Sequence, residues 1–142
     1  MTNKSDQLVE FQWKARVYYE DTDAGGVVFY ANYLRYMERA RTEWLRHLGY
    51  EHQTLNDDYG LLFAVKEVSI SYKKPARLDE ELTVFSRVLK YRGASITFRQ
   101  IINNQQQELL TEAEVKVVCL NAETLKPSPM PEALLSELVN VN

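Results

Sequence analysis

The stretch Tyr18–Tyr33, YYEDTDAGGVVFYANY, connects a strand pattern to the strongest helix pattern in the chain. It contains three acidic residues followed by two adjacent glycines, namely Glu20, Asp21, Asp23, Gly25 and Gly26. Adjacent glycines disfavour the interior of a helix or a strand, so a turn is predicted between the two elements. A carboxylate that a turn holds beside a helix N-terminus can attack or polarise a carbonyl group. We therefore expect functional residues in this stretch.

The residues on either side of the turn predict a strand and then a long helix. Gln12–Glu20 alternates between apolar and charged positions, which is typical of a half-buried strand, and its inward face includes Tyr19. From Ala31 to Leu48 apolar residues recur every three or four positions, which indicates an amphipathic helix of roughly 18 residues and about 27 Å. Asn32 is expected to cap the start of this helix, and Gly49 is expected to end it.

The remainder of the chain predicts mostly strands. A short helix or turn is expected at Glu51–Tyr59, and a proline-containing segment precedes a final short helix at Glu132–Val139. Four strand patterns lie between them, at Leu62–Tyr72, Glu81–Tyr91, Ala94–Ile102 and Leu109–Leu120. Short turns between consecutive strands favour antiparallel pairing. One long helix and about five strands predict an α+β architecture in which the helix fills the core.

Length, charge and composition limit the class of protein. The 142 residues fit one domain, with residues 1–11 as a flexible N-terminal tail and residues 12–142 as the domain. A net charge of −3 gives no basis for general nucleic-acid affinity, and no segment has the length of a transmembrane helix. The single cysteine, Cys119, allows no intramolecular disulfide, so a cytoplasmic location is the default expectation. His47 and His52 do not have the usual i, i+4 spacing of a helical metal pair, and no metal is expected.

Four stretches of the chain resemble the 4-hydroxybenzoyl-CoA thioesterase family, and most of all its branch of bacterial acyl-CoA thioesterases associated with the Tol–Pal envelope system. They are RVYYEDTDAGGVVFYANY (Arg16–Tyr33), MERARTEWL (Met37–Leu45), VSISYKKPARLDEEL (Val68–Leu82) and TEAEVKVVCLN (Thr111–Asn121). The resemblance implies a hotdog fold, in which a curved antiparallel sheet wraps around one long helix. It also implies homo-oligomers, namely dimers that pair their sheets edge to edge and assemble into tetramers.

The same resemblance assigns catalytic roles. The family's catalytic carboxylate falls on Asp23, which would act as nucleophile or as general base. Asp21 is interpreted as a residue that shapes the turn through hydrogen bonds to the backbone. The family's oxyanion donor, a backbone N–H at the helix entrance, falls on Tyr30. Tyr19 matches an active-site tyrosine of the family, although a core aromatic is an equally good interpretation. From the residues alone, both acids would be read as turn and cap residues.

The side chain at position 30 and the basic residues near the site are expected to affect how the substrate binds. Many members of the closest branch have histidine where this chain has Tyr30, and a tyrosine serves as a hydrogen-bond donor rather than as a base at neutral pH. Coenzyme A carries phosphates, so exposed cations near the site are expected. The candidates are Lys73, Lys74, Arg77 and Arg92, with Lys126 as a further one. For each of them a solvated surface charge is the alternative. Glu38 and Arg41 are spaced to form an i, i+3 pair on the helix.

Three functions are compatible with these features. The first is an acyl-CoA thioesterase without a metal or redox cofactor, whose substrate is an acyl-CoA or an acyl-carrier-protein thioester. The second is a catalytically weak hotdog module that binds acyl-CoA or acyl carrier protein and is linked to envelope lipid metabolism, because fold alone does not fix function. The third, a dehydratase, needs a histidine before the helix, which this chain lacks. The acyl group stays open between short aliphatic, long aliphatic and aromatic groups.

Overall fold

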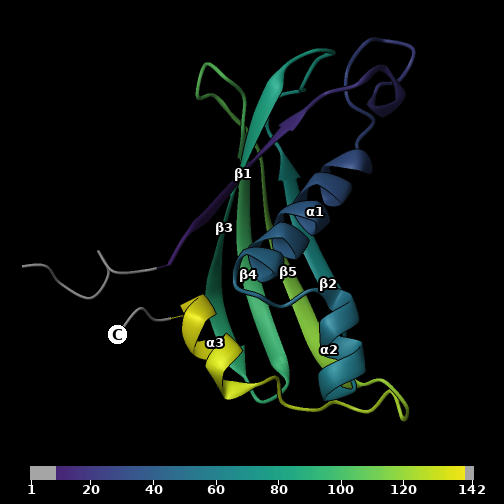
Figure 1. The fold of residues 1–142 in the computed structure, drawn as a ribbon. Coiled ribbons are helices and arrows are strands. Elements are labelled where there is room, and N and C mark those ends of the chain that lie inside the picture. The colour runs from purple at the N-terminus through teal and green to yellow at the C-terminus, as the bar shows by residue number, and fades with distance from the viewer. Residues whose placement is uncertain (1–8, 140–142) are drawn as a thin grey trace, which may run out of the picture.

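The computed structural model describes residues 9–139, in which one five-stranded sheet is associated with three α-helices (Figure 1). The strands are β1 (Phe11–Arg16), β2 (Leu61–Tyr72), β3 (Glu81–Arg92), β4 (Ser95–Asn103) and β5 (Leu109–Asn121). The helices are α1 (Asn32–His47), α2 (His52–Tyr59) and α3 (Glu132–Val139). Most of the tail predicted at residues 1–11 lies outside the described residues, and Phe11 already belongs to β1. In residues 9–139 no helix combines the length and the apolarity needed to cross a bilayer.

The sheet is entirely antiparallel and has the order β1-β3-β4-β5-β2, so β1 and β2 form its two edges. Figure 1 shows α1 lying across one face of the sheet, with α2 and α3 near the end opposite to the loop that precedes α1. The α+β class, the five strands and the hotdog arrangement predicted from the sequence are confirmed.

Helix α1 is the main core element, as its periodicity predicted. Its inward side chains Met37, Ala40 and Trp44 are 0%, 0% and 2% exposed. The Trp44 ring stacks on Phe11 of β1, with 5.9 Å between the ring centroids. Burial of each large apolar side chain contributes about 1.5–3 kcal/mol. The helix is not the only filler, however, because Leu55 of α2 and Leu134 and Leu138 of α3 are also fully buried.

The two ends of α1 differ in how well the sequence predicted them. Gly49 has φ +92°, a left-handed conformation that favours glycine, and it ends the helix as predicted. Asn32 does not cap the start, because it is already the first helical residue and Ala31 occupies the capping position. The Asn32 side-chain amide instead donates a hydrogen bond of 2.9 Å to the carbonyl oxygen of Asp21. That bond ties the helix to the preceding loop.

A buried polar cluster joins α1 to the middle of the sheet. Nη1 of Arg41 donates to Oε1 of Gln100 at 2.7 Å, and Nε2 of Gln100 donates to the Met37 carbonyl and to Ser86 Oγ at 2.9 Å each. The predicted ion pair between Glu38 and Arg41 is therefore wrong, because the guanidinium turns to the sheet. Burial lowers the pKa of Arg41 to about 10, and the nearby charge of Glu38 only partly opposes that shift.

Candidate functional site

The loop before α1 is a narrow turn closed by backbone hydrogen bonds. The Asp23 N–H donates to the Val27 carbonyl at 2.9 Å, and the Gly26 N–H donates to the Asp23 carbonyl at 3.0 Å. Gly26 has φ +81°, which explains why glycine is required there. The predicted turn is thus confirmed, and its bonds fix the backbone that carries Asp23.

The carboxylate of Asp23 is exposed at this turn and only partly engaged. Its Oδ1 accepts a hydrogen bond of 2.8 Å from the Gly25 N–H, while Oδ2 accepts none from residues 9–139. A Cβ atom at Gly25 would lie 3.3 Å from Oδ1, closer than nine in ten real Cβ contacts. Gly25 therefore allows the backbone and the carboxylate to approach each other, and one carboxylate oxygen stays available for chemistry.

A segment between β2 and β3 holds this loop in place. The Val28 N–H donates to the Ala76 carbonyl at 2.9 Å, and the Ala76 N–H donates to the hydroxyl of Tyr33 at 2.9 Å. The Leu78 N–H donates to the Gly26 carbonyl at 3.4 Å. Burial, above all, raises the pKa of Tyr33, so the phenol stays protonated at neutral pH. Residues 76–78 thus connect the turn, α1 and the sheet.

Asp21 has the supporting contacts that were predicted for it. Its Oδ2 accepts the Tyr18 N–H at 2.9 Å, and its carbonyl oxygen accepts the Phe29 N–H at 2.9 Å. The same carbonyl oxygen also accepts the Asn32 side-chain amide. Asp21 therefore links the start of the loop to its end and to the helix, whereas the Asp23 carboxylate accepts only the bond from the neighbouring Gly25 N–H among residues 9–139.

Tyr30 lies in the turn directly before α1, and its side chain is 64% exposed. Within residues 9–139 its N–H donates no hydrogen bond, and its carbonyl accepts one of 3.3 Å from the hydroxyl of Tyr72. Its ring contacts Phe29 and meets the Tyr72 ring edge-on, with centroids 4.9 Å and 6.2 Å apart. The N-terminal end of a helix carries partial positive charge, so an N–H there suits a developing oxyanion.

Tyr19 was predicted on the inward face of the first strand, and that placement is wrong. The strand ends at Arg16, and Tyr19 begins a short 3-10 turn in which its side chain is 82% exposed. The turn forms because the Tyr19 carbonyl accepts hydrogen bonds from both the N–H and the hydroxyl of Thr22. Tyr19 thus projects to solvent from the loop that carries Asp23, and its catalytic role stays a prediction.

The predicted basic residues separate into two groups. Lys73 and Lys74 follow β2 and line a hollow with Tyr30 and Tyr72, and Lys74 forms a 2.7 Å ion pair with Glu108. Arg77 lies in the segment that holds the loop.

Arg92 ends β3 at the opposite end of the sheet, roughly 36 Å from Glu81 at about 3.3 Å per strand residue. Lys126 also belongs to that end, where its carbonyl accepts the Asn121 N–H. Of the five predicted cations, Lys73, Lys74 and Arg77 lie near the loop, and Arg92 and Lys126 do not.

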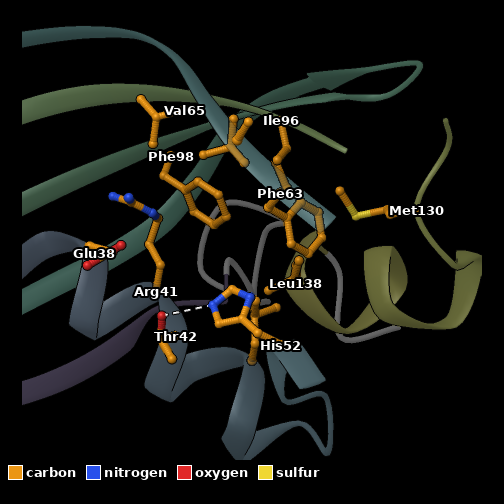
Figure 2. A pocket seen from close by; sticks show the side chains of 13 residues that line it. Glu38, Arg41, Thr42, His52, Phe63, Val65, Ile96, Phe98, Met130 and Leu138 are labelled. Carbon is orange, nitrogen blue, oxygen red and sulfur yellow. Dashed lines mark hydrogen bonds between the residues drawn. The ribbon is translucent and has the colours of Figure 1, made fainter. Parts of the chain in front are cut away.

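A second feature, which the sequence interpretation missed, is a cavity of about 80 Å³ between α1, α2, α3 and the sheet (Figure 2). His52 was interpreted as a surface residue, and although it is mostly exposed, it lines this cavity and contacts Thr42 Oγ1 through Nε2 at 3.1 Å. Tyr72 was missed as well, because its partner lies 42 positions earlier and no local pattern connects the two. Only the fold brings such residues together.

Comparison with known proteins places this geometry in a family. A family model described as the thioesterase-like superfamily matches residues 17–138. The acyl-CoA thioester hydrolase YbgC of Escherichia coli is 45% identical over 127 residues, which cover 89% of this chain and 94% of that protein. The acyl-CoA thioesterase YbgC of Haemophilus influenzae is 45% identical over 122 residues, which cover 86% of this chain and 89% of that protein.

A solved structure supports the same assignment. The crystal structure of a probable thioesterase from Bartonella henselae superposes with a TM-score of 0.81 at 34% identity, and covers 87% of this chain and 100% of that one. The resemblance predicted from the four sequence stretches is confirmed by these matches. The chain belongs to the thioesterase-like superfamily.

Proposed function

We propose that the protein hydrolyses acyl-CoA thioesters to a free acid and coenzyme A. The observation that carries the proposal is the available Oδ2 of Asp23, in the same loop as the unpaired N–H of Tyr30. A carboxylate and an N–H donor beside one helix entrance are the two groups that thioester hydrolysis needs. The similarity to acyl-CoA thioester hydrolases supports the same activity.

In the mechanism, the thioester carbonyl oxygen accepts a hydrogen bond from the Tyr30 N–H. As a nucleophile, the Asp23 carboxylate attacks the carbonyl carbon, and the carbon–sulfur bond breaks with coenzyme A leaving as the thiolate. Water then hydrolyses the anhydride to the free acid and the Asp23 carboxylate, and the proton released from water passes to the thiolate. As a general base, Asp23 takes a proton from water, the hydroxide attacks, and the proton passes to the departing thiolate. Both routes produce the acid and the thiol, and both stabilise the same oxyanion. Removal of one such donor typically costs about 10²–10³ in rate.

Lys73, Lys74 and Arg77 are the cations proposed to bind the phosphates of coenzyme A, since they surround the hollow next to Tyr30 or hold its loop. Arg92 lies too far away in the same chain and contributes only if a second copy brings it near. The exposed tyrosines Tyr19 and Tyr30 are proposed to contact the substrate. A tyrosine at position 30 supplies a hydrogen-bond donor but no neutral-pH base.

A homo-oligomer is part of the proposal. Strand β2 is a 12-residue edge with exposed Val65, Val68 and Tyr72, and natural proteins rarely leave so long an apolar edge uncovered. A dimer paired through this edge, and a tetramer built from it, are expected in solution, which light scattering after size exclusion will measure. The cytoplasmic location, the use of acyl carrier protein and the link to the Tol–Pal envelope system stay predictions.

The test of catalysis is Asp23→Asn, which keeps the size of the side chain and removes its charge. We expect thiol release from acyl-CoA to fall by about 10³ or more while the melting temperature stays near that of the wild type. Wild-type turnover by this variant would overturn the mechanism.

The second candidate is a module that binds acyl-CoA without hydrolysing it, which Tyr30 favours because many members of the branch that this chain resembles have histidine at that position. Saturable binding of acyl-CoA by the wild type with no thiol release would support that candidate instead.

A further inference from the structure

Tyr33, in the first turn of α1, contacts the connection between β2 and β3 from inside the protein. Its side chain is 3% exposed, and its hydroxyl accepts a hydrogen bond of 2.9 Å from the Ala76 N–H. Ala76 is fully buried. A backbone N–H in such a place needs a partner within the protein, because an unpaired buried donor costs free energy. The Tyr33 hydroxyl is the partner that the fold provides.

Ala76 transmits this contact to the loop before α1. Residues 26–28 and 76–78 pair in the antiparallel sense, at the end of the sheet where β2 ends and β3 begins (Figure 1). The Val28 N–H donates to the Ala76 carbonyl at 2.9 Å. Ala76 is therefore bonded to Tyr33 through its N–H and to Val28 through its carbonyl. We call these two hydrogen bonds the Ala76 tether.

The Ala76 tether lies between the two groups that are proposed to react with the thioester. Both ends of residues 28–33 are bonded to Ala76, and Tyr30 lies inside that segment. On the other side of the tether, the Val27 carbonyl accepts the Asp23 N–H at 2.9 Å. The tether thus restrains the helix entrance and the turn that carries the carboxylate with respect to each other.

Contact with the substrate is the alternative role for Tyr33. The residue borders the hollow beside Tyr30 and Tyr72, but nearly all of its own surface is buried. Burial raises the pKa of the phenol, so Tyr33 stays protonated at neutral pH and cannot serve as a base. Its one hydrogen bond within residues 9–139 goes to the backbone and not toward the hollow.

We propose that Tyr33 is a positioning residue for thioester hydrolysis, which holds the Tyr30 N–H and the Asp23 carboxylate in register through the Ala76 tether. The inference rests on the proposed thioesterase function and adds to it a buried group that touches neither the substrate nor the reacting atoms. Misplacement of reacting groups by about 1 Å can cost about 10² in rate, so a restraint of this kind acts on kcat.

The test is Tyr33→Phe, which removes the hydroxyl and keeps the ring, with butyryl-, palmitoyl- and benzoyl-CoA as substrates. We expect kcat to fall about 10-fold or more while KM stays within about twofold of the wild type. Ser86→Ala is the control, because Ser86 is also fully buried and its hydroxyl accepts a 2.9 Å hydrogen bond from Gln100 in the middle of the sheet. It is expected to lower the melting temperature by a similar few degrees and to keep the wild-type kcat.

The variant Asp23→Asn provides the background for a second comparison. Once the carboxylate is gone its placement no longer matters, so Tyr33→Phe is expected to leave the residual rate of Asp23→Asn almost unchanged. A general loss of folded protein would lower that residual rate by the same factor as in the wild type. Equal factors in the two backgrounds overturn the inference, as does an unchanged kcat. A change confined to KM also overturns it and makes Tyr33 a substrate contact.

If Tyr33→Phe does not fold, Ala76→Gly tests the same tether from its other side. Glycine adds backbone freedom at the residue that both hydrogen bonds share. We expect a smaller fall in kcat at unchanged KM, and again no further effect in the Asp23→Asn background. Wild-type kcat in Ala76→Gly would overturn the inference.

Amide hydrogen exchange separates the tether from the proposed function. If the wild type releases no thiol from any of the three substrates, the proposed function fails, and the tether is then tested by exchange across residues 21–30. Exchange that is about fivefold or more faster in Tyr33→Phe, and unchanged in Ser86→Ala, supports the tether without catalysis. Equal exchange in the wild type and in Tyr33→Phe refutes the tether.

Discussion

The hydroxyl of Tyr72, at the end of β2, donates a hydrogen bond of 3.3 Å to the carbonyl oxygen of Tyr30, at the entrance of α1. The two rings meet edge-on with centroids 6.2 Å apart. The contact joins an edge strand to the turn that contains the proposed oxyanion donor, so the sheet restrains the orientation of that turn.

Tyr72→Phe removes this hydrogen bond and keeps the ring. A net hydrogen bond contributes about 0.5–1.5 kcal/mol, so we expect kcat to fall roughly 2- to 12-fold with little change in KM. Steady-state kinetics measure both constants. A change confined to KM would show that Tyr72 binds substrate rather than orienting the turn.

Gly25→Ala is expected to disturb the catalytic carboxylate. The new Cβ would lie 3.3 Å from Asp23 Oδ1, which pushes the carboxylate away from the Gly25 N–H. We expect kcat to fall about 10-fold or more at an almost unchanged melting temperature, since the turn is exposed. Ala24→Ser, at the neighbouring exposed position, is the control. Full activity in Gly25→Ala would mean that the Asp23–Gly25 contact has no role in turnover.

Tyr30→Phe tests the side chain separately from the backbone. The backbone N–H persists in this variant, so kcat is expected to stay within about threefold of the wild type. Tyr30→His is expected to add a group that titrates near pH 6.5 to the pH–rate profile, because imidazole has an unperturbed pKa of about 6.5. If Tyr30→Phe loses most of the activity, the phenolic hydroxyl takes part in the reaction directly.

Trp44→Ala tests the core. Trp44 is 2% exposed and packs between Phe11 and Phe98. Removal of such a ring typically costs about 3–5 kcal/mol through lost burial and the cavity left behind. Urea unfolding measures the free energy difference, and Arg46→Ala on the exposed face of the same helix is expected to cost much less, because exposed ion pairs contribute little to stability. Equal effects of the two variants would contradict the assigned core face.

Burial raises the pKa of the Cys119 thiol to about 11, so the folded state keeps it protonated at pH 8. Because the thiolate is the reactive form, iodoacetamide is expected to label the native protein far more slowly than the urea-unfolded protein. The folded thiol holds its proton more tightly than the unfolded thiol, whose pKa is about 8.5. The free energy of unfolding is therefore expected to fall as the pH rises from about 8.5 toward 11, where the folded thiol also loses its proton. Rapid native labelling at pH 8 would place Cys119 at the surface instead.

The elements of the fold were predictable because their signals are local. The three-to-four-residue repeat of Met37, Ala40 and Trp44 predicted the buried face of α1, and Gly49 predicted its end. The strand predicted at Leu109–Leu120 is β5, and its alternate residues Ala113, Val115, Val117 and Cys119 are buried. Such patterns survive folding because a helix or a strand in contact with a core repeats the same environment at its own period.

The candidate site was predictable only in part. The turn at Asp23 followed from two adjacent glycines, and the supporting role of Asp21 followed from its spacing. The position of Tyr19 could not be predicted in this way. The strand ends at Arg16 and a 3-10 turn stabilised by Thr22 follows, and the alternating pattern does not show where a strand stops. The Glu38–Arg41 spacing on the helix was correct, but Gln100 on the sheet offered the guanidinium a buried acceptor.

By itself, the sequence determined which segments are helix or strand, the turn that carries Asp23, and the family. These depend on neighbours along the chain or on short motifs. The tertiary structure alone decided that Tyr72 meets Tyr30, that Arg92 lies at the far end of the sheet from Lys73, and that Leu138 of α3 lines a cavity together with residues of α1 and the sheet. These relationships depend on strand order and on how α1 crosses the sheet. They involve residues that lie many positions apart in the sequence, and a local sequence pattern does not indicate how far apart such residues lie in space.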